Sequence, residues 1–162
     1  MRFHLIDRIE EIKYDEYIIA VKCVSLADDV FNEHFPGYPV FPGSLILEGL
    51  AQLGGCFFEL IMKNRNELVR RSILSIVNKM KFRKAVEPGD RLIYRADVIS
   101  FCEDYGIVSV KAENTGILCA EGELTFSFID IPDKSLNDSR LELYKICMKN
   151  TLVINAGKTQ TN

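Results

Sequence analysis

Residues 34–43 read His-Phe-Pro-Gly-Tyr-Pro-Val-Phe-Pro-Gly, and residues 44–52 continue with Ser-Leu-Ile-Leu-Glu-Gly-Leu-Ala-Gln. The first stretch is stiff, because each proline fixes its own φ and biases the preceding residue towards an extended conformation. The second stretch opens an apolar run that reaches from Ser44 to about Lys63. A helix that is apolar on nearly every side must be enclosed by other parts of the protein. The sequence therefore predicts a rigid loop that leads into one long, buried central helix.

A membrane span is the rival interpretation of this helix. Glu48, Gln52 and Glu59 argue against it, since each of these side chains would be costly in hydrocarbon. Glycines lower helix propensity, but we expect the glycines of this helix to let a backbone or another helix approach closely, as at a contact between subunits. These glycines are Gly49, Gly54 and Gly55.

Runs rich in β-branched and aromatic residues flank the helix and predict strands. The predicted strands span residues 3–12, 17–25, 71–86, 91–101, 107–112 and 117–131. Two strands, one long helix and four strands in meander spacing indicate the α+β class, with an antiparallel sheet wrapped around one helix. Residues 1–131 are predicted to form this domain. Residues 132–162 form a C-terminal extension, with a short helix over 140–149 and a disordered end over 156–162.

Composition narrows the classes of function. A chain of 162 residues fits one domain, and its net charge of −3 argues against a nucleic-acid partner. The first residues lack the uninterrupted apolar segment of a signal peptide. The five cysteines show no C-x-x-C spacing, which predicts free thiols in a reducing cytoplasm and no metal site.

The loop and the helix together carry candidate catalytic groups. His34 lies in a loop rigid enough to aim its ring, and an imidazole suits a general base near neutral pH. Glu48 lies one turn inside the helix among apolar neighbours, which disfavour the ionised carboxyl and suit a proton donor. Gln52 shares its helical face and is expected to orient it. The amide of Gly43 at the helix start is expected to stabilise an oxyanion. The alternatives are an ordinary surface histidine and a solvated glutamate.

These residues resemble the β-hydroxyacyl-(acyl-carrier-protein) dehydratases of bacterial type II fatty acid synthesis. The resemblance rests on residues 34–52, with support from Leu-Ile-Asp-Arg-Ile at 5–9, Lys-Phe-Arg-Lys-Ala-Val-Glu-Pro-Gly-Asp at 81–90 and Ala-Glu-Gly-Glu-Leu at 120–124. The spacing from His34 to Glu48 matches that of the family. Glutamate at position 48 is similar to the general elongation dehydratases, whereas the branch that also isomerises the double bond has aspartate.

The resemblance implies a hotdog fold and a dimer, or a trimer of dimers. In the implied dimer, His34 of one subunit faces Glu48 of the other across an acyl tunnel. It also implies that the carbonyl of Val40 holds the ring of His34, and that the amide of Gly43 binds the thioester oxygen. Phe41 and Ser44 depart from the family pattern, which leaves the shape of the tunnel open.

The predicted activity is dehydration of (3R)-hydroxyacyl thioesters to trans-2-enoyl thioesters in the cytoplasm, with no cofactor and no metal. The predicted partner is an acyl carrier protein, which the basic residues Lys81, Arg83 and Lys84 are expected to dock; Lys79 lies in the same run. No nucleic acid and no membrane span are expected. Two alternatives stay open, a hotdog acyl thioesterase and a non-catalytic acyl-binding protein of the same fold.

Overall fold

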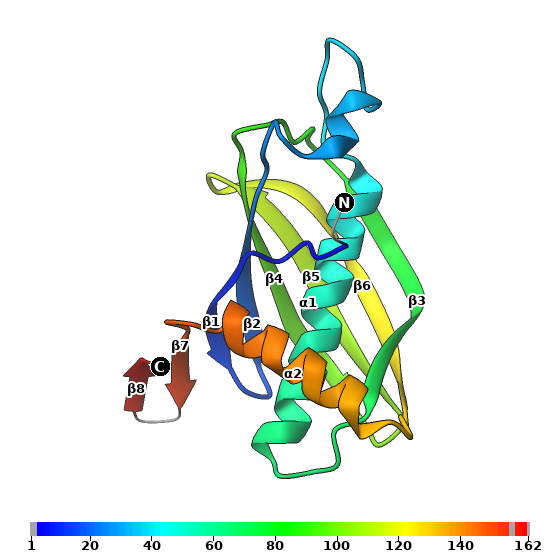
Figure 1. Ribbon diagram of the computed structural model, residues 1–162, viewed down its shortest axis with the longest axis vertical. Helices are drawn as coiled ribbons and strands as arrows, with labels where there is room; N and C mark the ends of the chain where they lie inside the picture. Colours follow the sequence, from blue (N-terminus) through cyan, green and yellow to red (C-terminus); the bar gives the residue numbers. More distant parts are fainter. Residues whose placement is uncertain (1–2, 156–157, 162) are drawn as a thin grey trace.

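The computed structural model describes residues 3–155 and 158–161. Its centre is the helix α1 (Gly43–Asn64), which a curved sheet wraps on one side (Figure 1). A short 3₁₀ helix, η1 (Asp29–Asn32), precedes the proline-rich loop. The helix α1 starts immediately after Pro42, as the sequence predicted.

Over the described residues the sheet has eight strands in the order β3-β6-β5-β4-β2-β1-β7-β8. Their bounds are β1 (Arg8–Lys13), β2 (Tyr17–Cys23), β3 (Arg71–Phe82), β4 (Arg91–Phe101), β5 (Tyr105–Asn114), β6 (Ile117–Ile129), β7 (Leu152–Asn155) and β8 (Lys158–Thr161). Neighbouring strands are antiparallel except β1 and β7, which are parallel. The predicted α+β architecture, a sheet wrapped around one long helix, is confirmed.

The position of β3 differs from the predicted meander. Strands β4, β5 and β6 follow one another as a meander, but β3 pairs with β6 and forms one edge of the sheet. The segment 83–90 makes the crossover from β3 to β4. It is hydrogen-bonded to neighbouring elements on both sides. Arg83 N donates to Cys119 O at 2.7 Å, and Phe41 N donates to Val86 O at 2.7 Å. The crossover therefore also holds the proline-rich loop in place.

The C-terminal extension is more ordered than the sequence predicted. Its helix α2 (Lys134–Cys147) starts earlier than residue 140, because Asp133 caps it and accepts from Ser135 N at 2.9 Å. The predicted disorder over 156–162 is wrong for residues 158–161, which form β8 on β7. The free edge of β1 supplies the backbone partners that order this segment, since β7 pairs with it. Residues 156, 157 and 162 lie outside the described part.

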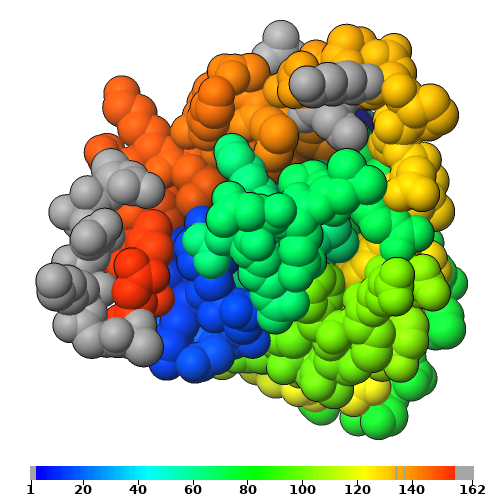
Figure 2. Space-filling model, turned by 90° about the horizontal axis from the view of Figure 1, so that it is seen from below, coloured from blue at the N-terminus to red at the C-terminus, as the bar shows by residue number. Residues whose placement is uncertain are grey.

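The helix α2 crosses α1 on the side that the sheet leaves open (Figure 1). Seen from below, the end of α1 lies between α2 and the hairpin of β1 and β2 (Figure 2). By length and composition α1 could cross a membrane, but 78% of its most apolar window is buried inside the fold. It is therefore the core helix of the domain.

The glycines of α1 accommodate aromatic side chains of the sheet. A Cβ atom on Gly49 would lie 2.6 Å from the ring of Tyr94, and one on Gly54 would lie 2.9 Å from the ring of Phe126. The prediction that these glycines admit another helix or a backbone is therefore wrong. The helix packs on its own sheet, and large rings opposite glycine bring the two close together.

This packing predicts opposite effects for two similar substitutions. Gly49→Ala should lower the free energy of unfolding by about 1 kcal/mol net, because overpacking costs about 1–3 kcal/mol and helix propensity returns about 1 kcal/mol. Gly55→Ala is the matched control, since its nearest atom would be at an ordinary 3.4 Å. It should raise stability in urea unfolding. A Gly49→Ala protein as stable as Gly55→Ala would contradict this account.

Candidate active site

The loop fixes both the position and the proton arrangement of His34. Its backbone is held by His34 N, which donates to Val30 O at 3.0 Å, and by Val40 N, which donates to His34 O at 3.0 Å. Phe35 stacks on the imidazole at 4.1 Å between centroids. The ring atom Nδ1 lies 2.7 Å from Val40 O. A carbonyl oxygen can only accept, so Nδ1 carries a proton, and in the neutral ring Nε2 then presents a lone pair.

Glu48 is half-buried on α1 and is held by Gln52. Gln52 Nε2 donates to Glu48 Oε1 at 2.9 Å and to Phe3 O at 3.2 Å. Gln52 Oε1 accepts from Leu5 N at 2.9 Å. These contacts fix which way the amide of Gln52 points. The N-terminal segment thus positions the candidate acid through Gln52.

A hollow of about 270 Å³ lies at the start of α1. Val40, Gly43, Phe82, Arg83 and Lys84 are among the residues that line it. The amide of Gly43 has no acceptor within the helix, because the first N–H groups of any helix lack one. The ring of Phe82 packs closely on the start of the helix, since a Cβ atom on Gly43 would lie 3.0 Å from it. The structure therefore brings the candidate oxyanion donor and two of the predicted basic residues together.

The predicted basic run is divided by the strand geometry. Lys81 lies in a different hollow of about 250 Å³, with acidic residues of β6. Lys79 Nζ is 3.3 Å from Glu123 Oε1. Arg83 forms a salt bridge with Glu121, and this hydrogen bond holds the pKa of Glu121 below its usual value. Within the described residues, Lys84 has no ion pair, so it is the cation of this run that remains available at the Gly43 hollow.

Glu48 lines a separate cavity of about 280 Å³ between α1 and α2. Its walls are formed by Phe3, His4, Ile6, Ile9, Gln52, Cys56, Arg140, Leu143, Tyr144 and Cys147. His4, to which the sequence analysis gave no role, lies with Nε2 3.3 Å from Cys147 Sγ. Burial lowers the pKa of His4 and raises the pKa of the Cys147 thiol, so both groups favour their neutral forms.

Below this cavity, Glu59 joins α1 to the C-terminal extension. Glu59 is 2% exposed, and it accepts from Ser72 N at 3.1 Å and from the hydroxyl of Tyr144 at 3.0 Å. Arg71 Nε and Arg140 Nε lie 3.6 and 3.3 Å from its carboxylate.

The charged and polar groups around Glu59 stabilise one another. Burial opposes the charge of Arg140, yet Tyr144 and Glu59 keep the pKa of its guanidinium above the usual value. Sequence reasoning missed the cluster, although a glutamate on a buried helix is itself a signal that cationic partners lie elsewhere in the chain.

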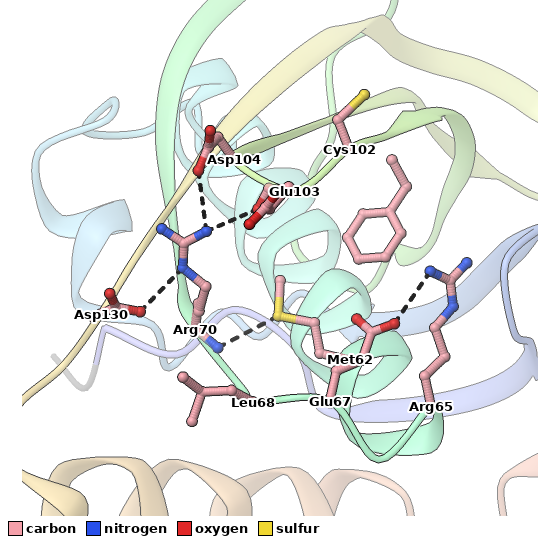
Figure 3. Close-up of a pocket in the computed structure, with 10 residues that line it drawn as sticks. Met62, Arg65, Glu67, Leu68, Arg70, Cys102, Glu103, Asp104 and Asp130 are labelled. Carbon is pink, nitrogen blue, oxygen red and sulfur yellow. Dashed lines mark hydrogen bonds and ion pairs between the residues drawn. The ribbon is translucent and has the colours of Figure 1, made fainter.

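A wider hollow of about 660 Å³ lies at the other end of α1 (Figure 3). Its charged groups are occupied with one another. Arg70 Nε donates to Asp130 Oδ1 at 3.1 Å, and Nη1 donates to Asp104 Oδ1 at 3.2 Å. Nη1 also donates to Glu103 O at 2.8 Å. Arg70 thus connects the start of β3 to the end of β6 and to the turn between β4 and β5. The predicted site residues do not line this hollow. Among the described residues, no group of three or more His, Cys, Asp or Glu is arranged to hold a metal.

The geometry and the comparisons with known proteins define the class. Residues 1–125 match the family described as a FabA-like domain. Solved structures share the fold. The dehydratase heterocomplex ApeI:P from Xenorhabdus doucetiae has a TM-score of 0.66 at 19% identity and covers 86% of this chain and 90% of that one. A hypothetical thioesterase with coenzyme A from Streptococcus pneumoniae TIGR4 has a TM-score of 0.61 at 13% identity, with coverage of 80% and 91%. The domain is a FabA-like protein with the hotdog fold.

Closer sequence relatives carry one name, 3-hydroxyacyl-(acyl-carrier-protein) dehydratase FabZ. The protein of that name from Campylobacter curvus is 37% identical over 131 residues, which are 79% of this chain and 88% of the relative. The one from Streptococcus equi subsp. zooepidemicus (strain MGCS10565) is 44% identical over 124 residues, with coverage of 76% and 86%. The chain belongs to the FabZ family of dehydratases.

Proposed function

We propose that the protein dehydrates (3R)-hydroxyacyl thioesters, carried by an acyl carrier protein, to trans-2-enoyl thioesters in the cytoplasm. The observation that carries the proposal is the 2.7 Å contact of His34 Nδ1 with Val40 O, which leaves Nε2 free to act as a base. The names of the FabZ relatives support the substrate class.

Each group has a distinct part in the proposed reaction. Nε2 of His34 takes the α-proton of the thioester, and the amide of Gly43 stabilises the negative charge that develops on the carbonyl oxygen. The C–O bond at the β-carbon breaks as the double bond forms. Protonated Glu48, oriented by Gln52, gives its proton to the departing hydroxyl, which leaves as water. Proton exchange with solvent restores both residues.

We further propose that each site is built from two subunits of a homodimer. Within one chain, Glu48 lines the cavity under α2, whereas Val40 and Gly43 line the hollow at the start of α1. The exposed edge strand β3 supports the pairing of subunits. Unpaired apolar strand edges invite association, and Ile73 and Ile76 on β3 are 45% and 56% exposed. A trimer of such dimers is compatible with this arrangement.

A hotdog thioesterase is the main alternative, because it would use the same scaffold with a carboxylate that activates water. The two reactions leave different products. With 3-hydroxybutyryl and crotonyl thioesters, a dehydratase interconverts the two and changes enoyl absorbance, whereas a thioesterase releases free thiol. Thiol release without a change in enoyl absorbance would overturn the proposed function.

Substitutions at the site should fall in a definite order. His34→Ala and Glu48→Gln should each lower kcat by about 10²–10⁴-fold, the usual contribution of a positioned acid or base. Gln52→Ala should cost less, about five- to tenfold, because it removes about 1 kcal/mol of hydrogen bonding that orients Glu48. Glu67→Gln, in the exposed loop that follows α1, is the matched control. Near-full activity of His34→Ala, or a larger loss in Gln52→Ala than in Glu48→Gln, would refute these roles.

Hybrid dimers test the composite site. Mixed His34→Ala and Glu48→Gln subunits should regain activity, because one of the two sites in a hybrid dimer then contains both intact groups. The regained activity should increase as the fraction of hybrid dimers increases. Mass spectrometry of the mixture measures that fraction. Hybrid dimers that form but stay inactive would mean that one chain supplies the whole site.

Carrier docking is proposed at Lys84, with Arg83 beside it. Lys84→Glu should raise KM for a carrier-bound substrate by several-fold at low salt, since electrostatic steering fades as ionic strength rises. The loss should be much smaller for a pantetheine thioester. Lys149→Glu makes the same charge change on a distant exposed lysine and serves as control. Equal losses on both substrates would argue that Lys84 supports the fold or the tunnel.

A further inference from the structure

The cavity beside Glu48 is closed by a part of the chain that the family match does not include. The FabA-like match ends at residue 125, whereas α2 spans Lys134–Cys147. Arg140, Leu143, Tyr144 and Cys147 of α2 nevertheless line the same cavity as Glu48. One wall of the cavity is therefore specific to this extension.

The lining of this cavity suits an alkyl chain. Glu48 and Gln52 lie at one end of the α1 wall, and Cys56 continues that wall two turns of helix further on. Apolar side chains supply the other sides, among them Ile6 and Ile9. Polar groups at the site are paired, since Gln52 holds Glu48 and His4 contacts Cys147. A proton donor at one end of an apolar cavity suits a β-hydroxyl group with its tail running inward.

The α2 wall is held rigidly in place. Glu59 anchors Arg140 and Tyr144, which are one turn apart on α2. Beyond the helix, the hydroxyl of Thr151 donates to Ile9 O at 2.6 Å, and Thr151 is fully buried. The α2 wall is thus fastened at both ends. An alkyl chain too long for the cavity cannot displace α2 without breaking buried polar contacts.

We propose that the cavity between α1 and α2 receives the acyl chain of the thioester substrate, and that α2 sets the preferred chain length through Leu143. This inference rests on the proposed dehydratase function. The cavity has a volume of about 280 Å³ and α2 forms one of its walls, so we expect an acyl chain that extends through the cavity to meet α2.

Substitutions at Leu143 can make the cavity either smaller or larger, so one position allows two opposite tests. Leu143 lies at the rim of the cavity and is 36% exposed, so a change there leaves the core intact. Leu143→Trp fills the cavity and should lower the C8:C4 ratio of kcat/KM, measured on 3-hydroxyacyl thioesters of one carrier, by at least about tenfold. Leu143→Ala enlarges it and should raise the C12:C8 ratio. Ile146→Trp is the matched control, because Ile146 lies on the same helix, is 73% exposed and borders a different hollow.

The same variants give a binding signal that is independent of turnover. The chain contains no tryptophan, so the indole introduced by Leu143→Trp is a single fluorophore at the cavity rim. Octanoyl-pantetheine should shift its emission, whereas acetyl-pantetheine should leave it unchanged, and Ile146→Trp should respond to neither. This signal separates the two proposals: wild-type protein inactive on every chain length would refute the dehydratase function, while the fluorescence would still test the cavity.

Two results would overturn the inference. One is a C8:C4 ratio that stays within twofold of wild type in Leu143→Trp. The other is an indole at position 143 that responds to octanoyl-pantetheine no more than the indole at position 146. Equal losses on short and long chains would produce the first result, and would show that α2 acts on the fold and has no part in selecting the acyl chain.

Discussion

A polar stripe on an otherwise buried helix governs how this chain folds around its site. Glu48, Gln52, Cys56 and Glu59 are spaced so that all four lie on one face of α1. Glu48, Gln52 and Cys56 line the cavity that α2 also lines. Buried polar groups must find partners. The partners come from the N-terminal segment, from the start of β3 and from α2, so the stripe helps to determine where these three parts pack on α1.

The two ends of the stripe differ in chemistry. At Glu48 the partner is the neutral amide of Gln52, which orients the carboxyl without neutralising it. At Glu59 the partners are two guanidinium groups, a hydroxyl and a backbone amide, which compensate for the burial of the carboxyl group. The two carboxyl groups on this helix face therefore differ in their surroundings: Glu48 is oriented by one amide, whereas Glu59 anchors both β3 and α2. Gln52 also connects Glu48 to the backbone of Phe3 and Leu5, which makes the N-terminal segment part of the site.

The parts of the fold that sequence reasoning predicted are those set by local rules. Prolines and the apolar run fixed the start of α1, and the strand patterns located β4 and β6 within a few residues. The position of β3 beside β6 was missed. The order of strands depends on which strand edges are left to pair in the folded sheet, and the sequence of a strand does not show this. The start of α2 was missed although Asp133 is a common capping residue. The glycines of α1 were assigned the wrong neighbour, since a sequence does not show whether an aromatic ring or a backbone fills the space.

For the site, the sequence predicted single residues better than their surroundings. The spacing of His34 and Glu48 was visible, and the contact of His34 with Val40, which the family resemblance implied, is present. The wall that α2 builds was not visible, because Arg140 and Tyr144 meet Glu59 across about half of the chain. Tyr144 and Cys147 belong to the same core as the residues of α1. The extension therefore shares the hydrophobic core of the hotdog domain, and a change in α2 reaches the space next to Glu48 through packed side chains.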